Sequence, residues 1–167
     1  EERYKMIHTG HLTPDMKQRY KKERPGEVGA LNVNERWDGL FGAVSPDGIS
    51  WSPLPDPLVA QISDTHNACE YDPVLGQYVA YVRNHFFARR TIGRSASDDF
   101  RRLPLSEDLF WPGTLEEPYD LWYTAAKTKM PGTTDYHIMF PLRWRLIDDS
   151  FSFVLAASPD NILWSYV

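Results

Sequence analysis

The sequence lacks the residues and runs that several protein classes require. It has one cysteine, Cys69, in 167 residues, which excludes an internal disulfide framework, and the apolar residues around it predict a buried, inert thiol. No run approaches the roughly 18 consecutive apolar residues of a membrane span, so we expect no membrane partner. The net charge of −5 excludes the strongly basic face typical of nucleic-acid binding.

The motifs of several enzyme classes are also absent. There is no glycine-rich phosphate loop and no Gly-x-Ser-x-Gly nucleophile elbow. His8 and His11 form the only close histidine pair, and no cysteine cluster accompanies them, so we predict no metal site and no cofactor. The chain begins at Glu1 and ends within the apolar run 162–167, both typical of a piece of a longer protein, and it shows no signal peptide.

What the chain does have is a recurrent turn. A run of β-prone residues ends three times at a serine-led acidic segment, at residues 45–48, 97–100 and 158–161. The spacing of these turns is near the roughly 40 to 50 residues of a four-stranded propeller blade. In Ser45-Pro46-Asp47-Gly48 the aspartate can accept backbone amides, and the glycine, like Asn161 in the third turn, suits a left-handed backbone.

These turns predict an all-β fold. We expect a β-propeller fragment of about two and two-thirds four-stranded antiparallel blades, from a longer parent protein. Residues 1–167 would form a single partial propeller domain, with blade units at approximately 1–58, 59–112 and 113–167. Blades left uncovered at their edges predict self-association.

Strands are expected wherever β-prone runs lie between turn signals. They are 3–8, 37–44 and 49–54; then 64–71, 77–83, 89–95 and a short strand from Leu103; then 120–126, 136–140, 151–157 and 162–166. Residues 78–82 and 153–157 are nearly all apolar, which predicts strands covered on both faces. Residues 16–24, after Thr13 and before a Pro-Gly pair, predict a short helix.

Two aspartates open the first strands of successive blade units, Asp64 and Asp120. The innermost strands of a propeller converge on a central funnel, so both carboxylates are expected to face one cavity. Paired carboxylates are what the hydrolysis of a glycosidic bond requires, one to protonate the departing oxygen and the other to activate water or attack carbon.

The chain resembles the five-bladed β-propeller glycoside hydrolases of families 32, 43 and 68, through residues 45–51, 64–73, 76–83 and 93–100. The resemblance implies a parent protein with five blades and carbohydrate hydrolysis, and it slightly favours a secreted or periplasmic location. It also implies an acid from each of three blades, and the first of these would lie upstream of Glu1.

The second-blade acid of that family corresponds by position to Asp64. Asp72, in a Tyr-Asp-Pro segment, is assigned to an outer hairpin and is not a candidate. For the general acid of the third blade the resemblance offers Glu116, or else Asp120 takes the cavity position and Glu116 is a solvated loop charge. A non-catalytic propeller that binds a glycan or a protein remains the alternative function.

Other polar and aromatic residues near the expected funnel are candidates for binding a carbohydrate ligand. Histidine, asparagine and arginine can hydrogen-bond sugar hydroxyls or an acidic sugar, and flat aromatic rings can stack on sugar rings. Each also has a structural alternative as a satisfied strand residue or a packing residue. The candidates are His66, Asn67, Arg83, Trp122, Tyr123 and His137, with Trp111 as a further possible aromatic platform.

Overall fold

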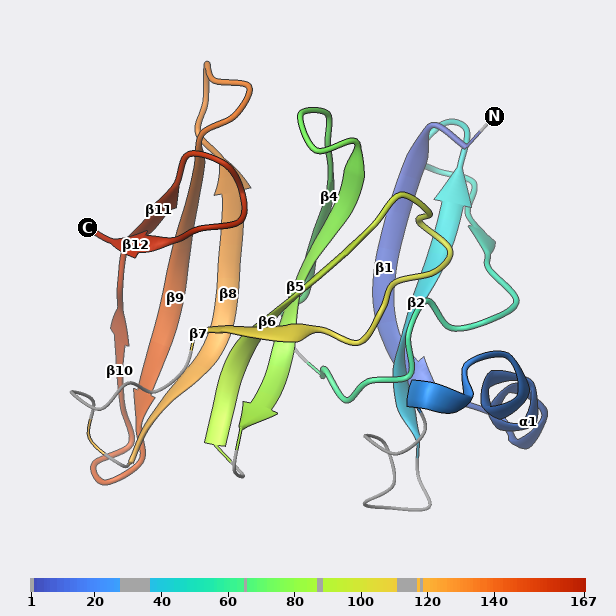
Figure 1. Cartoon of the computed structure of the whole chain (residues 1–167), viewed down its shortest axis with the longest axis horizontal. Helices are drawn as coiled ribbons and strands as arrows, with labels where there is room; N and C mark the ends of the chain where they lie inside the picture. The colour runs from blue at the N-terminus through green and yellow to red at the C-terminus, as the bar shows by residue number, and fades with distance from the viewer. Residues whose placement is uncertain (1, 28–36, 65, 87–88, 111–116, 118) are drawn as a thin grey trace. The chain divides into compact units, whose positions relative to one another are not determined.

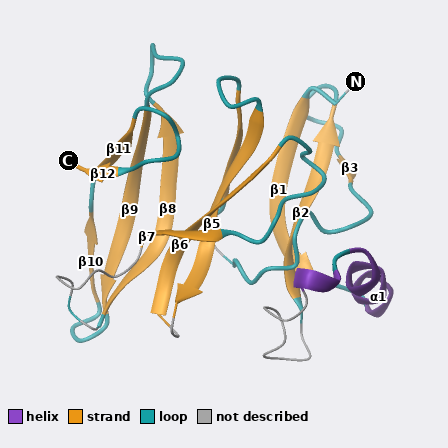
Figure 2. Ribbon diagram, viewed as in Figure 1, coloured by secondary structure: helices purple, strands orange, loops and turns teal. Residues whose placement is uncertain are grey.

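The computed structural model describes residues 2–27, 37–64, 66–86, 89–110, 117 and 119–167. Strands dominate these residues (Figure 2), and no helix among them combines the length and apolar composition that crossing a bilayer requires. The chain divides into two compact units. The first comprises Glu1–Asp64 and Ser97–Leu105, and the second Thr65–Ala96 and Ser106–Val167.

The first unit contains a three-stranded sheet and a helix (Figure 1). Strand β1 (Tyr4–His11) pairs antiparallel with β2 (Asp38–Ser45), which also pairs with the short β3 (Ser52–Pro53). Between β1 and β2 the chain forms α1 (Pro14–Glu23). The predicted strands of this segment are therefore confirmed, with β3 shorter than expected.

Helix α1 begins where the capping signals predict. The Thr13 hydroxyl accepts a hydrogen bond from the Met16 amide at 3.3 Å, and the last turn carries two lysines that favour the negative end of the helix dipole. The helix is anchored through Tyr20, which is 4% exposed and packs in a core cluster with Leu12 and Trp37. Tyr20 is the buried residue of α1, and the other residues of the helix, which are mostly polar, are half-buried or exposed.

The second unit contains two sheets. The first has the order β4-β5-β6-β7, formed by β4 (Ala68–Asp72), β5 (Gln77–Phe86), β6 (Arg89–Ser97) and β7 (Glu107–Phe110). The predicted first strand, residues 64–71, is corrected here. His66 has a positive φ of 48°, which an extended strand does not allow, so pairing starts only at Ala68.

The other sheet of this unit has five strands. They are β8 (Asp120–Lys129), β9 (His137–Arg145), β10 (Ser150–Phe153), β11 (Ala156–Ser158) and β12 (Ser165–Tyr166). Strand β9 lies at the centre of the sheet and pairs antiparallel with β8, β10 and β11.

The third strand predicted in this segment, 151–157, is wrong as a single strand because it divides into β10 and β11. The interruption lies opposite Pro141 of β9, which has no N–H to donate to the ladder. The predicted cover on both faces is confirmed for Val79–Val82, which are 0 to 2% exposed. It is wrong for Phe153 of β10, which is 74% exposed.

The serine-led turns have the hydrogen bonds expected of them. Asp47 Oδ1 accepts the Ile49 and Ser50 amides at 2.8 and 2.7 Å and the Ser45 hydroxyl at 2.9 Å. These bonds lower the pKa of Asp47 to about 2. Asp160 accepts in the same pattern, and Gly48 and Asn161 have φ of 77° and 60°. Each of these two turns therefore joins its strands through an aspartate and a left-handed residue.

Candidate functional site

Asp120 is a buried carboxylate at the beginning of β8. Its residue is 3% exposed, and its backbone carbonyl accepts the Arg89 guanidinium at 2.6 Å. Its Oδ1 lies 3.4 Å from Arg145 Nε in an ion pair but forms no hydrogen bond within the described chain. Buried carboxylate oxygens normally accept hydrogen bonds, so this oxygen has acceptor capacity that the protein does not use.

Arginines and aromatic rings lie around the same ends of β5, β6 and β8. The Arg83 guanidinium carbon is 5.2 Å from the centre of the Tyr123 ring, and that of Arg90 is 4.9 Å from the same ring. Arg90 also lies 5.3 Å from the ring of Trp144, which stacks on Phe151 with an interplanar angle of 9°. The structure therefore brings Arg83 and Tyr123 together, as two of the predicted binding residues.

Trp122, the residue next to Tyr123, has a different environment. It is 2% exposed, and its ring stacks on Tyr166 at 5.8 Å and lies 5.9 Å from Phe110. It belongs to the hydrophobic core between the two sheets of the second unit. Trp122 is therefore a packing residue in the described structure. Tyr123, in contrast, is only half-buried.

His137 and Asp120 lie at opposite ends of the β8–β9 ladder. In the β8–β9 ladder Asp120 is opposite Arg145, while His137 is opposite Lys129 at the other end. Nine strand residues separate the two ends, which is roughly 30 Å at the rise of a β-strand. A single sugar-binding site cannot contain both residues.

His137 instead belongs to a buried polar cluster between the two sheets. Its Nε2 is 3.5 Å from Asp72 Oδ2 and its Nδ1 is 3.5 Å from Glu70 Oε1, and Glu70 also forms an ion pair with Lys127. Asp72 accepts the Asn161 side-chain amide at 2.7 Å. Sequence reasoning missed this cluster, because it assigned Asp72 to an outer hairpin, whereas the residue is 1% exposed.

The neighbouring Cys69 is free and its burial raises the pKa of its thiol to about 12. A thiol with so high a pKa is protonated at neutral pH, in line with the expected inertness, although Cys69 is half-buried and not fully buried as predicted. Among the described residues, no group of three or more histidine, cysteine, aspartate or glutamate side chains is placed to hold a metal ion.

Asp64 and Asp120 fall in different compact units. Asp64 is exposed and belongs to the first unit. The predicted sugar contacts belong to the second unit, where His66 is exposed and Asn67 is half-buried. Glu116 and Trp111 lie outside the described residues. The shared cavity of Asp64 and Asp120 therefore stays a prediction.

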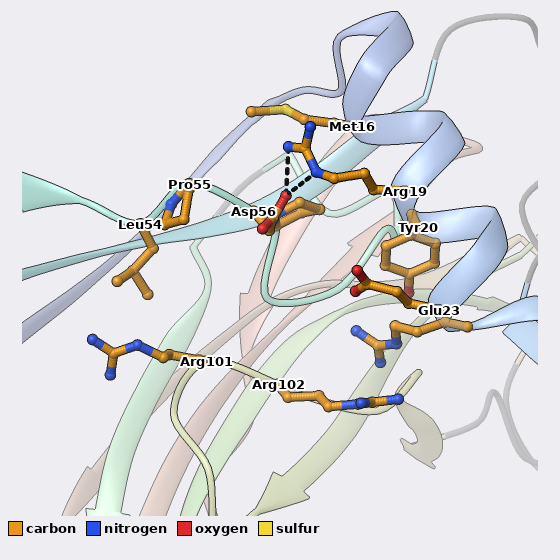
Figure 3. Close-up of a pocket in the computed structure, with 11 residues that line it drawn as sticks. Met16, Arg19, Tyr20, Glu23, Leu54, Pro55, Asp56, Arg101 and Arg102 are labelled. Carbon is orange, nitrogen blue, oxygen red and sulfur yellow. Dashed lines mark hydrogen bonds and ion pairs between the residues drawn. The ribbon is translucent and has the colours of Figure 1, made fainter.

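The first unit contains a pocket of about 210 Å³ that the sequence did not indicate (Figure 3). One wall is helix α1, from Met16 to Arg24. The others are the segment Leu54–Pro57 and the pair Arg101 and Arg102. Four arginines and two carboxylates line it.

Comparison with known proteins was made at the level of sequence and of structure. No protein-family model and no curated protein matches the chain. Among solved structures, the chain is similar to a protein named "Glycoside hydrolase", with a TM-score of 0.50 and 15% sequence identity. The match covers 81% of this chain and 44% of that one, so the chain spans less than half of the matched structure. At this identity the likeness shows the fold, which is a glycoside hydrolase-like all-β fold.

The polar cluster around His137 predicts a loss of stability at mildly acidic pH. Burial, together with the positive charge of Lys127, lowers the pKa of His137 below its ordinary 6.5, although Asp72 opposes the shift. Below pH 6.5 the unfolded chain therefore binds a proton that the folded chain resists. The free energy of unfolding should fall as pH drops, by at most about 1.4 kcal/mol per pH unit.

Urea unfolding measured between pH 5 and 8 checks this expectation. The His137→Gln variant should lose most of the dependence between pH 5 and 6.5, whereas His66→Gln, at an exposed histidine, should keep it. An unchanged pH profile in His137→Gln would contradict the assignment. Asp72, whose pKa is lowered by the Asn161 side chain and two turn amides against the opposing effect of burial, adds a loss only below pH 3.8.

Proposed function

We propose that this chain is part of a carbohydrate-active protein that hydrolyses glycosidic bonds, and that its sheets are blades of a propeller. The fold likeness to a glycoside hydrolase supports the class. The separation of the described strands into antiparallel sheets of three, four and five strands, in chain order, supports the blade assignment.

The observation that carries the proposal is the environment of Asp120. A carboxylate that is 3% exposed, fixed by arginines and left with an oxygen free of hydrogen bonds, suits a group that acts on a bound substrate. In this proposal Asp120 is one of the carboxylates that face the glycosidic bond, and Asp64 is another. Glu116 is retained as a candidate general acid, so the division of roles between Glu116 and Asp120 remains open.

Arg83 and Tyr123 are proposed as substrate contacts beside Asp120. The Arg83 guanidinium lies over the face of the Tyr123 ring at 5.2 Å, and this contact fixes the orientation of both side chains. His66 and Asn67 are kept as proposed contacts on the strength of the sequence alone. Trp122 and His137 are not included, because one is a core residue and the other lies at the far end of the sheet.

A non-catalytic glycan-binding protein is the second candidate. One observation favours it: Phe151 is 51% exposed and stacks at 5.8 Å on Trp144, which makes a flat aromatic surface of the kind that sugar rings cover. Such a surface binds sugars without requiring two carboxylates.

One experiment separates the two functions. The protein, at the full length its gene encodes, is assayed for turnover on a panel of aryl glycosides and plant and bacterial polysaccharides, and for sugar binding by calorimetry. Turnover supports hydrolysis. Binding without turnover supports the second candidate alone. If the protein shows no binding and no turnover on the whole panel, a carbohydrate-active role is contradicted.

A further inference from the structure

Arginine side chains gather at the end of the second unit where Asp120 lies. Each of four guanidinium groups contacts either Asp120 or the ring of Tyr123, which lies three residues further along β8. The four are Arg83, Arg89, Arg90 and Arg145. Asp120 contributes a single negative charge to this set, so the set as a whole is positively charged.

Arg90 differs from Arg89 and Arg145 in how the protein uses its guanidinium group. Arg89 donates to the backbone carbonyls of Glu117 and Asp120, at 3.0 and 2.6 Å, and Arg145 forms an ion pair with Asp120. Across the described part of the chain, the side chain of Arg90 forms no hydrogen bond or ion pair, and its Nη1 is buried without an acceptor. A guanidinium carries five N–H donors, and buried donors normally find acceptors. Arg90 therefore has donors that a ligand can use.

Two aromatic rings fix the position of Arg90. Its guanidinium carbon lies 4.9 Å from the centre of the Tyr123 ring and 5.3 Å from that of Trp144, and these rings meet edge to face at 5.4 Å. Trp144 stacks in turn on Phe151, and its indole N–H donates to Asp149 at 2.8 Å. A fixed positive charge therefore lies beside the flat surface that Trp144 and Phe151 form.

The backbone of β8 contributes to this arrangement. The register of the β8–β9 ladder shifts between Trp122, opposite Arg143, and Thr124, opposite Leu142. Tyr123 is the additional residue at this irregularity. Bulges of this kind redirect a side chain and are frequent beside active sites. Here the ring of Tyr123 contacts the arginines, whereas Trp122 packs in the core.

The combination of a charge and a flat surface indicates the chemistry of the ligand. A sugar ring can cover an aromatic surface, and the carboxylate of a uronate unit offers two coplanar oxygens that match the guanidinium fork. A neutral sugar would leave the charge of Arg90 without a counter-charge. Tyr123 lies roughly 10 Å along β8 from Asp120, so Arg90 is placed to contact a sugar unit near the bond and not the bond itself.

We propose that the site around Asp120 takes an acidic polysaccharide, one that contains uronate units, and that Arg90 binds the carboxylate of one such unit. The ring of this unit lies against Trp144 and Phe151. This substrate class rests on the carbohydrate-active role proposed above. Arg90 determines specificity in this scheme and takes no part in breaking the glycosidic bond.

Calorimetry with matched pairs of trimers tests the substrate class, using the protein at the full length its gene encodes. The pairs are trigalacturonate with its methyl ester and a β-1,4-linked glucuronate trimer with cellotriose, and a sulfated galactose oligomer is a third arm. At least one uronate trimer should bind about tenfold more tightly than its neutral partner, and the sulfated oligomer should bind more weakly than that uronate. Equal binding within both pairs, tighter binding of the sulfated oligomer, or no saturable binding of either uronate at roughly 10 mM would overturn the proposal.

The substrate class and the proposed hydrolysis fail separately in this experiment when turnover is measured on the same trimers. Neutral trimers that are bound or cleaved without any preference for uronates overturn the role of Arg90 and leave hydrolysis standing. Uronates that are bound preferentially but not cleaved support the role of Arg90 and favour the non-catalytic candidate.

Substitutions test the location, and the measured quantity is the ratio of the affinities for a uronate trimer and its neutral partner. Arg90→Gln should lower this ratio about tenfold while the neutral trimer binds as before, which a purely structural role would not produce. Arg143→Gln removes the same charge one position before Trp144, where Arg143 Nε donates to Ser152 at 3.2 Å, and should leave the ratio unchanged. An unchanged ratio in Arg90→Gln, or an equal loss in Arg143→Gln, would overturn the assignment.

A conservative variant covers the case in which Arg90→Gln does not fold. Arg90→Lys keeps a cation beside the rings but lacks the planar fork, so it should lower the ratio about two- to fivefold. The unfolding midpoint of each preparation shows that the variants are folded. A folded Arg90→Lys variant with the ratio of the unmodified protein would contradict recognition through the fork.

Discussion

Replacing Asp120 by asparagine should lower turnover of a cleavable glycoside about a thousandfold while the protein stays folded. Asparagine has the shape of aspartate but can neither take up a proton nor attack a sugar carbon. The packing at the beginning of β8 is retained, including the backbone bond from Arg89. The measurement is kcat and KM on the best substrate of the panel, with the unfolding midpoint of the same preparation.

Asp98→Asn is the matched control, since it makes the same chemical change in an exposed turn. Its turnover should equal that of the unmodified protein. Asp64→Asn should abolish turnover, because the proposal gives both carboxylates a place at the bond. Full activity in Asp120→Asn would exclude this residue from the chemistry, and full activity in Asp64→Asn would remove the paired-carboxylate argument.

Replacing Asn161 by alanine should destabilise the second unit by about 3 kcal/mol. Asn161 is fully buried; its amide donates to Asp72 at 2.7 Å, and its side-chain oxygen accepts the Tyr81 hydroxyl at 2.6 Å. Alanine leaves the Asp72 carboxylate without this donor, at about 1 to 3 kcal/mol. It also lacks the short polar side chain that helps asparagine to tolerate a left-handed φ of 60°, which adds about 1 kcal/mol.

Chemical denaturation of Asn161→Ala and Asn161→Gly separates the two contributions. Glycine loses the same hydrogen bonds but tolerates the left-handed backbone, so it should be more stable than alanine by about 1 kcal/mol. A loss below about 1 kcal/mol in Asn161→Ala would show that the Asp72–Asn161–Tyr81 contacts are not the structural centre that their burial indicates.

Most of the strand-and-turn pattern was predictable because it depends on residues that are close together in the sequence. Their own residues are enough to predict the apolar run Val79–Val82 and the turns at Asp47 and Asp160. The division of residues 151–157 was not predictable in this way. It depends on Pro141, in another strand, being opposite the break.

The candidate site was predictable only in part, for a similar reason. Asp120 was selected because it opens a strand, and Tyr123 follows from the same strand. Asp72 was rejected because its Tyr-Asp-Pro segment was assigned to an outer hairpin, but a neighbouring sheet supplies Asn161 and His137 and buries it. The pocket beside α1 depends on Arg101 and Arg102, which are far from the helix in sequence and carry no motif that relates them to it.

The first unit is assembled from two stretches of chain, because Ser97–Leu105 belongs to it. Leu103, which was expected to begin a strand, is fully buried; its amide donates to Leu58 at 3.0 Å and its carbonyl accepts Arg24. During synthesis, residues 1–64 therefore emerge from the ribosome without a segment that completes their fold. We expect the nascent unit to remain open to proteases and chaperones until position 105 has left the exit tunnel, when folding of the first unit can finish.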